Sequence, residues 1–155
     1  MNDLSDLLRP DAVLTGMTAP TKKMVLQLLG AAAAPLLDLP AKSIVDRLAE
    51  REKLGSTGFG GGVALPHAKI EGIAQVTGLF ARLSQAVDFQ AVDDMPVDLV
   101  FVLLSPTNAG ADHLKALARV SRRMRDRTFL AKLRGAGSRD AVYALFATDE
   151  TRDAA

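Results

Sequence analysis

Apolar residues recur along the chain with spacings that predict alternating strands and helices. A short apolar run over residues 12–17 predicts a first strand. Residues 19–38 and 40–55 predict two helices, because apolar positions repeat every three to four residues in the first and Gly55 follows the second as a stop signal. Thr21 stands where its hydroxyl would cap the first of these helices.

A glycine-rich stretch, STGFGGG, follows the second helix and predicts a turn region. Three further strands are expected after it, in VALPH (residues 63–67), VTGLFARLS (residues 76–84) and VDLVFVLLSP (residues 97–106). The last run is almost continuously apolar, which is typical of a central strand that is covered on both faces. The middle of the chain therefore predicts most of a sheet.

The remainder of the chain predicts three helices. One face of the first would carry Leu114, Leu117, Ala118, Ser121 and Met124. Two shorter helices are expected around residues 129–133 and 142–146. Because the elements follow in the order β-α-α-β-β-β-α-α-α, we expect an α/β sandwich in which helices cover both faces of one sheet. We expect a single domain over residues 1–155.

Composition narrows the class of protein. Of the 155 residues, 48% are apolar and 24% are charged, which is ordinary for a soluble globular domain. The absence of cysteine excludes disulfides, thiolate chemistry and cysteine-ligated metals, and the two histidines do not suffice for a histidine-rich metal site. The sequence predicts no signal peptide and no membrane span, so we expect a cytoplasmic protein that is not embedded in a membrane.

The balance of charge argues against binding to nucleic acid. The formal net charge is +1, and the chain has one tyrosine and no tryptophan. A basic segment, KALARVSRRMRDR (residues 115–127), has no aromatic residues interleaved with its charges. We therefore interpret it as the solvated face of a helix, which can also contribute to docking of a protein partner.

The glycine-rich stretch is the least ordinary part of the chain. Five glycines fall between Gly55 and Gly62, which is costly in backbone entropy. Their amides could approach an anion closely and form a concave nest around it. Neither the phosphate-loop pattern nor the dinucleotide pattern is matched, because no Gly-Lys-Ser/Thr follows and the glycine spacing is wrong. The glycines alone indicate tolerance of an anion.

His67 follows this stretch directly after Pro66, whose ring restricts the backbone in front of the imidazole. A large share of free imidazole is unprotonated at neutral pH, and its nitrogen can attack phosphorus and later leave again. A histidine in a turn can equally hydrogen-bond backbone carbonyls without any chemistry. From the residues alone, both interpretations remain open.

The stretch REKLGSTGFGGGVALPHAK (residues 51–69) resembles the active-site region of the fructose/mannitol-type IIA proteins of the bacterial phosphotransferase system (PTS). It is most similar to their nitrogen-regulatory branch, which typically reads R-E-x-x-G-S-T-G-x-G-x-G-[IV]-A-[IL]-P-H-[GA]-K. LSDLLRPDAV, PVDLVFVLLSP and ADHLKALARVSRRMRD also resemble family segments, so the similarity covers residues 3–147, the expected ordered core. Gly61, where asparagine or aspartate is common, and Ala68, where glycine is common, are small departures. The family's fold is a three-layer α/β/α sandwich of the α+β kind with a mixed sheet.

The resemblance implies a role for five residues. His67 would accept a phosphoryl group from an HPr-like phosphocarrier protein, by family habit as a tele-phosphohistidine, although the sequence itself does not decide the nitrogen. Arg51, sixteen residues upstream, matches the family's active-site arginine, whose guanidinium would stabilise the phosphoryl group. His113 matches a second active-site histidine near a helix N-terminus. Ser56 and Thr57 match loop hydroxyls and are candidate donors to phosphate oxygens. No metal or organic cofactor is implied.

Without the resemblance, Arg51 would be one solvated charge at a helix end, and His113 a partly buried helix histidine. With it, two uses of the phosphoryl group remain. In the first, the protein is a regulator whose targets, by resemblance, are proteins such as sensor kinases or potassium-transport proteins. In the second, it passes phosphate to a IIB domain for fructose/mannitol-type sugar uptake. The REKLGSTG segment, and the lack of an IIB, membrane or HPr-like segment, favour regulation. A third interpretation, a domain that binds a free anion, predicts no covalent adduct.

Overall fold

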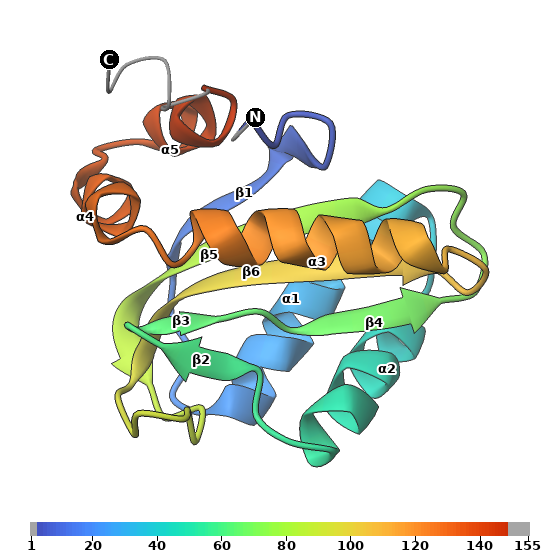
Figure 1. The fold of residues 1–155 in the computed structure, drawn as a ribbon. Helices are drawn as coiled ribbons and strands as arrows, with labels where there is room; N and C mark the ends of the chain where they lie inside the picture. Colours follow the sequence, from blue (N-terminus) through green and yellow to red (C-terminus); the bar gives the residue numbers. More distant parts are fainter. Residues whose placement is uncertain (1–2, 149–155) are drawn as a thin grey trace.

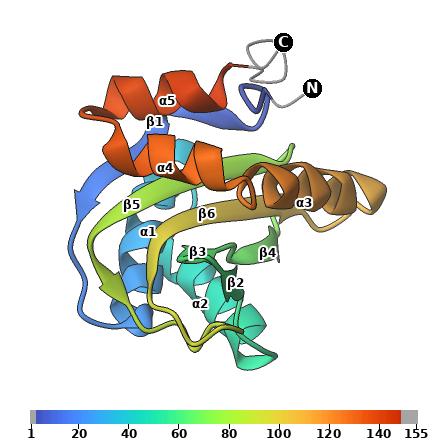
Figure 2. The same cartoon turned by 60° about the vertical axis from the view of Figure 1, so that its left-hand side comes forward.

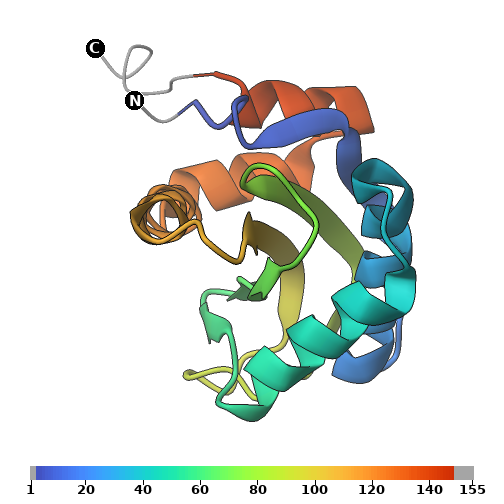
Figure 3. The same ribbon diagram turned by 90° about the vertical axis from the view of Figure 1, so that its right-hand side faces the viewer.

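One mixed sheet lies between two layers of helices in the structure, a computed structural model that describes residues 3–148 (Figure 1). Helices α1 (Lys22–Leu37) and α2 (Ala41–Lys53) lie on one face of the sheet. Helices α3 (Ala111–Arg123), α4 (Arg127–Gly135) and α5 (Arg139–Phe146) lie on the other, as the views in Figures 2 and 3 show. The expected three-layer α/β/α sandwich with a mixed sheet is confirmed.

The sheet is built around its longest apolar strand. In chain order the strands are β1 (Leu8–Met17), β2 (Gly58–Gly60), β3 (Val63–Ala64), β4 (His67–Ile70), β5 (Thr77–Val87) and β6 (Val97–Pro106). Their order in space is β1-β5-β6-β3-β2, and β4 also pairs with β6. The pairs β5–β6 and β2–β3 are antiparallel, whereas β1–β5, β3–β6 and β4–β6 are parallel. Strand β6 is central and buried, as its apolar run predicted.

The expected element order needs one correction, which concerns the strands before β5. Three strands were expected between the second and third helices, and the structure has five. The glycine-rich stretch, expected to be only a turn, contributes β2, which pairs with β3. The apolar run over residues 63–67 is divided at Leu65 and Pro66, and its two halves, β3 and β4, both pair with β6. The proline has no N–H to give to a sheet ladder, which accounts for the interruption.

Side-chain caps define most helix starts, as local sequence rules predict. The Thr21 hydroxyl accepts a hydrogen bond from the backbone N–H of Met24 at the start of α1, which confirms the expected cap. Asp126 and Ser138 do the same for α4 and α5.

No helix in residues 3–148 is long and apolar enough to cross a membrane.

Aromatic rings join the last two helices to the sheet. The Phe146 ring of α5 lies 4.9 Å from that of Phe80 on β5 and 5.7 Å from that of Phe101 on β6, measured between centroids. It also lies 5.3 Å from the ring of Phe129 on α4. All four side chains are fully buried, so this cluster fixes the C-terminal helices on their face of the sheet.

Helix α3 packs with a face that is rotated from the expected one, although Leu117 and Met124 do contact the core as expected. Its buried residues are His113, Ala116, Val120 and Arg123. Leu114, expected in the core, is 67% exposed. Periodicity assigns a histidine and an arginine to the solvent side, but here each has a partner: His113 contacts Ser105, and the Arg123 guanidinium lies 3.9 Å from the centroid of the Phe129 ring. This rotation of the helix turns His113 toward the sheet.

Candidate active site

A pocket of about 280 Å³ lies where α2, β4 and α3 meet, and His67, Arg51 and His113 all line it. Strand β4 begins at His67 and runs parallel to β6, with α2 packed beside it. Arg51 lies in the last turn of α2, and His113 lies in the first turn of α3. The structure therefore brings together three residues that are spread over sixty positions of the sequence.

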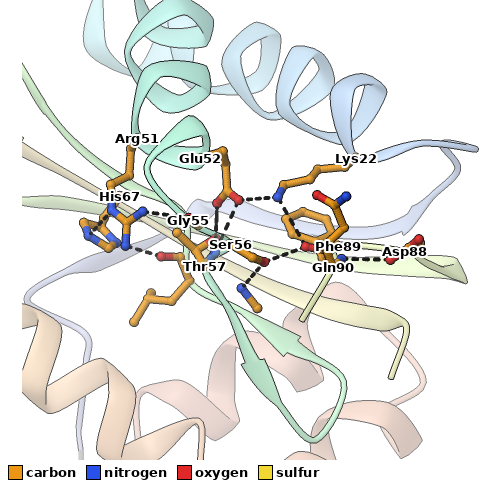
Figure 4. A network of polar contacts seen from close by, with 12 residues as sticks. Lys22, Arg51, Glu52, Gly55, Ser56, Thr57, His67, Asp88, Phe89 and Gln90 are labelled. Atoms are coloured by element: carbon orange, nitrogen blue, oxygen red, sulfur yellow. Dashed lines mark hydrogen bonds and ion pairs between the residues drawn. The ribbon is translucent and has the colours of Figure 1, made fainter. Parts of the chain in front are cut away.

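Two hydrogen bonds fix the tautomer of His67. The ring Nδ1 is 2.8 Å from the carbonyl oxygen of Leu65, which can only accept, so Nδ1 carries the proton and donates. Arg51 Nε donates to His67 Nε2 over 3.1 Å, and Arg51 Nη1 donates to the carbonyl of Gly55 over 2.8 Å. The contacts of the ring with Leu65 and with Arg51 therefore agree: Nδ1 carries the proton, and Nε2, beside the guanidinium, carries the lone pair (Figure 4).

The surroundings of His67 favour the neutral ring. Burial lowers the pKa of the imidazole, and the positive charge of Arg51 lowers it further. The hydrogen bond to the Leu65 carbonyl and the negative charge of Glu52 act in the opposite direction, and the net pKa lies below the ordinary value of 6.5. At neutral pH the Nε2 lone pair is therefore free of a proton and available as a nucleophile.

His113 is also neutral and lies beside His67. The centroids of the two imidazole rings are 5.7 Å apart. Burial lowers the pKa of His113, and the nearby His67 and Lys69 lower it further. The Nδ1 atom of His113 is 2.6 Å from the hydroxyl oxygen of Ser105 on β6, so this ring is anchored from the sheet below it.

The rim of the pocket is mainly basic. Arg47 and Lys69 line it together with Arg51, and Glu50 is the acidic residue among the lining side chains. Arg47 donates through Nε to the Lys69 carbonyl over 3.2 Å and through Nη1 to Glu50 over 3.1 Å. A shallow basic pocket with a neutral nucleophile suits a dianionic phosphoryl group. The sequence had not singled out Lys69, whose only signal was its place in the family-like stretch.

Glu52 anchors the loop that connects α2 to β2, a role that no feature of the sequence indicated. Its side chain is 6% exposed and lies 2.5 Å from Lys22 Nζ of α1. It accepts hydrogen bonds from both the backbone N–H and the hydroxyl of Thr57 (Figure 4). Lys22 Nζ also donates to the Phe89 carbonyl over 3.2 Å. The loop is therefore tied to α1 and to the segment after β5, directly behind Arg51.

Ser56 and Thr57 do not reach the pocket. The Ser56 hydroxyl donates to the Phe89 carbonyl over 2.5 Å, and the Thr57 hydroxyl donates to Glu52. Neither residue is among those that line the pocket around His67. In this structure both hydroxyls hold the loop in place, and their expected contact with phosphate oxygens has no support in the geometry.

The glycine turn is likewise locked by the protein itself. Gly61 and Gly62 have φ of +69° and +81°, a region that favours glycine. The N–H of Gly61 donates to Asp93, and its carbonyl accepts from Arg134. A Cβ on Gly62 would lie 2.5 Å from Arg134 Nη2. These glycines allow a tight turn against Arg134, and they are not among the residues that line the pocket, so the idea of an anion nest there is not supported.

Removing the Glu52 carboxylate should destabilise the protein. In Glu52→Ala the N–H and hydroxyl of Thr57 lose their acceptor and Lys22 loses its counter-charge, so we expect a loss of about 1–3 kcal/mol in unfolding free energy. Urea denaturation followed by circular dichroism measures the change. The matched control is Asp46→Ala, which breaks the exposed Lys42–Asp46 pair and should leave the midpoint nearly unchanged. Equal effects of the two substitutions would contradict the anchoring role.

Comparisons with known proteins agree on one family. The family described as "Phosphoenolpyruvate-dependent sugar phosphotransferase system, EIIA 2" matches residues 6–148. A nitrogen regulatory protein of Bradyrhizobium diazoefficiens is 46% identical over 144 residues, which is 93% of this chain and 94% of that protein. One from Escherichia coli is 36% identical over 148 residues, covering 95% and 91%. The crystal structure of nitrogen regulatory protein IIA-Ntr from Neisseria meningitidis superposes with a TM-score of 0.87 at 33% identity, covering 92% of this chain and 98% of that one.

Proposed function

Because the chain belongs to the EIIA 2 family of the phosphoenolpyruvate-dependent sugar phosphotransferase system, we propose that it carries a phosphoryl group on Nε2 of His67. The donor is an HPr-like phosphocarrier protein. The observation that carries this proposal is the pair of contacts at His67: the Leu65 carbonyl holds the proton on Nδ1, and Arg51 lies beside the free lone pair. Leu54, 85% exposed at the rim of the pocket, offers an apolar contact to a protein donor.

The transfer is an exchange of one N–P bond for another. The Nε2 lone pair of His67 attacks phosphorus, the bond to the donor's imidazole breaks, and its electron pair returns to the donor nitrogen. The proton on Nδ1 of His67 stays in place and keeps its hydrogen bond to the Leu65 carbonyl. Because Nδ1 keeps its proton, the ring leaves phosphorus as neutral imidazole, a good leaving group, so the same hydrogen bond supports onward transfer.

Arg51 stabilises the phosphoryl group during the exchange. Its Nε–H points at the Nε2 lone pair in the free protein, and that hydrogen bond must be given up when phosphorus arrives. Phosphoryl oxygens then take the place of the nitrogen as acceptors, while Nη1 stays anchored on the Gly55 carbonyl. The guanidinium thus neutralises charge on the transferring group without a large movement.

Regulation of other proteins is the use of this chemistry that the relatives support. The Bradyrhizobium diazoefficiens and Escherichia coli relatives are both described as nitrogen regulatory proteins. A phosphoryl group adds a charge of nearly two units beside exposed side chains, which changes the affinity of that surface for a target. We place the protein in the cytoplasm, with targets such as sensor kinases or potassium-transport proteins. The family description concerns sugar phosphotransfer, which keeps onward transfer to a IIB domain as the second candidate.

The experiment that tests the proposal is incubation with phosphoenolpyruvate, enzyme I and an HPr-like protein, followed by intact-mass measurement. We expect the mass to rise by one phosphoryl group, and the adduct to be lost in acid. NMR of ¹⁵N-labelled protein should show coupling of the phosphorus to Nε2 of His67. Lack of an adduct, or an adduct that survives acid, would overturn the proposal.

The rate of phosphoryl acceptance should fall on acidification with a midpoint below pH 6.5. The pKa of His67 is depressed, chiefly by burial, so more than half of the rings are neutral at pH 6.5, and the neutral form is lost as pH falls through the lower value. Single-turnover transfer from a phosphorylated donor gives the rate at each pH. Because the donor also titrates, the His67 titration should be followed separately by NMR. A His67 midpoint above 6.5 would contradict the prediction.

A further inference from the structure

Ser105 places a single hydroxyl inside β6, a strand in which Asp98 is the other polar residue. It lies near the C-terminal end of β6, and its side chain is fully buried. Its Oγ atom is 2.6 Å from Nδ1 of His113, a short distance for a hydrogen bond between a hydroxyl and an imidazole. In a strand that runs through the core, an apolar residue would fill this position without the need for a partner. The hydroxyl therefore calls for an explanation.

The direction of this hydrogen bond follows from counting donors and acceptors. Buried hydroxyl hydrogens are almost always donated. Within residues 3–148 the hydrogen bond recorded for the Ser105 hydroxyl is the one to His113 Nδ1. If Nδ1 carried a proton and donated it, the hydroxyl hydrogen would be left buried without an acceptor. Ser105 therefore donates, Nδ1 of His113 accepts, and the proton of the neutral ring resides on Nε2.

We propose that Ser105 is a positioning residue that fixes His113 in its Nε2–H tautomer, so that His113 donates a hydrogen bond to the phosphoryl group on His67. With Nδ1 turned toward β6, the Nε2 edge is the one left to face the pocket that His113 lines. The inference rests on the proposed phosphorylation of His67. It adds that Ser105, which does not line the pocket, determines whether His113 donates or accepts a hydrogen bond there.

The two imidazoles then have opposite and complementary tautomers. The Leu65 carbonyl keeps the proton of His67 on Nδ1 and leaves Nε2 as a lone pair. The Ser105 hydroxyl keeps the proton of His113 on Nε2 and leaves Nδ1 as the acceptor. One ring attacks phosphorus, and the other, 5.7 Å away, offers an N–H to its oxygens. The reverse tautomer of His113 would present a lone pair to a dianion and repel it.

The first test is the tautomer of His113 in the unphosphorylated protein, read from the ¹⁵N chemical shifts of its ring. We expect a protonated Nε2 and an unprotonated Nδ1 in the wild type, and a loss of this preference in Ser105→Ala. A change in packing alone would not move the tautomer in this way. A melting curve confirms that the variant is folded. An Nδ1–H tautomer in the wild type overturns the inference.

The second test asks whether Ser105 acts through His113. In Ser105→Ala the rate of phosphoryl acceptance should fall about tenfold, the size expected for one hydrogen bond to a charged group. In a His113→Ala background, which leaves no side-chain donor or acceptor at this position, the same substitution should have no further effect. If Ser105→Ala lowers the rate of phosphoryl acceptance equally in both backgrounds, the inference is overturned. The proposed function still stands in that case, provided that His67 gains its phosphoryl group. Absence of any phosphohistidine in the wild type overturns the proposed function, and the inference with it.

Discussion

His67→Gln should abolish the phosphoryl adduct and leave the protein folded. Glutamine is uncharged, like the neutral imidazole, and its amide keeps a donor at this position, so the substitution introduces no buried charge. The amide has no nucleophilic lone pair comparable with that of a neutral imidazole, so no N–P bond can form. Intact mass after incubation with phosphoenolpyruvate, enzyme I and the HPr-like donor should show only the unmodified chain. Circular dichroism should show an unchanged melting midpoint.

The matched control is His113→Gln, because the two histidines are the only ones in the chain. This variant keeps the nucleophile and loses the imidazole N–H beside it, a donor that the more flexible amide of glutamine replaces only in part, so it should still gain one phosphoryl group, at a lower rate. The pair of variants separates the acceptor from its neighbour. A normal adduct on His67→Gln together with none on His113→Gln would assign the acceptor role to His113 and refute the present assignment.

Arg51→Ala should slow phosphoryl transfer by about two to three orders of magnitude, the range seen when a preorganised donor to a developing anion is removed. The guanidinium both contacts the nucleophilic nitrogen and is held by the Gly55 carbonyl, so its position is set before the donor arrives. Arg51→Lys should recover only part of the rate, since an ammonium keeps the charge and lacks the planar fork. Rates come from single-turnover transfer with the phosphorylated donor in excess.

Arg47→Ala is the control for charge alone. Arg47 lines the same pocket, but its hydrogen bonds go to Glu50 and to the Lys69 carbonyl, and none goes to His67. Its removal changes the electrostatic potential of the pocket without touching the nucleophile, so we expect a loss of only a few-fold. If Arg47→Ala and Arg51→Ala slowed phosphoryl transfer by the same factor, Arg51 would contribute only to the general positive potential of the pocket.

Much of the fold could be predicted because local rules and the hydrophobic pattern agree. The apolar run of β6, the Thr21 cap and the helical spacing in α1 each indicate the element that the structure contains. Strand β2 could not be predicted in the same way, and the strand expected over residues 63–67 is divided into β3 and β4. Strands β2 and β3 are three and two residues long and are held by pairing with each other and by the pairing of β3 with β6, a partner far along the chain.

In the candidate site, too, some residues could be predicted from the sequence and others could not. His67, Arg51 and His113 were found through their chemistry and the family resemblance, and the structure places all three at one pocket. Ser56 and Thr57 lie in the same stretch of sequence, yet their hydroxyls turn away to Phe89 and Glu52. Adjacency in a motif says which residues occur together, whereas the direction of each side chain depends on acceptors supplied by other elements.

The sequence by itself determined the order of the main elements, the family and the three residues of the pocket, because these follow from short-range periodicity and from a long contiguous stretch of residue types. Only the tertiary structure decided which face of α3 is buried and which nitrogen of each histidine holds a proton. Those outcomes rest on contacts that only the folded backbone sets up, Leu65 with His67 where β4 begins and Ser105 with His113 across β6 and α3. Each of these hydrogen bonds selects one of the two tautomers of a histidine. The sequence does not distinguish the tautomers, because the energy of a buried polar group depends on the partner it meets.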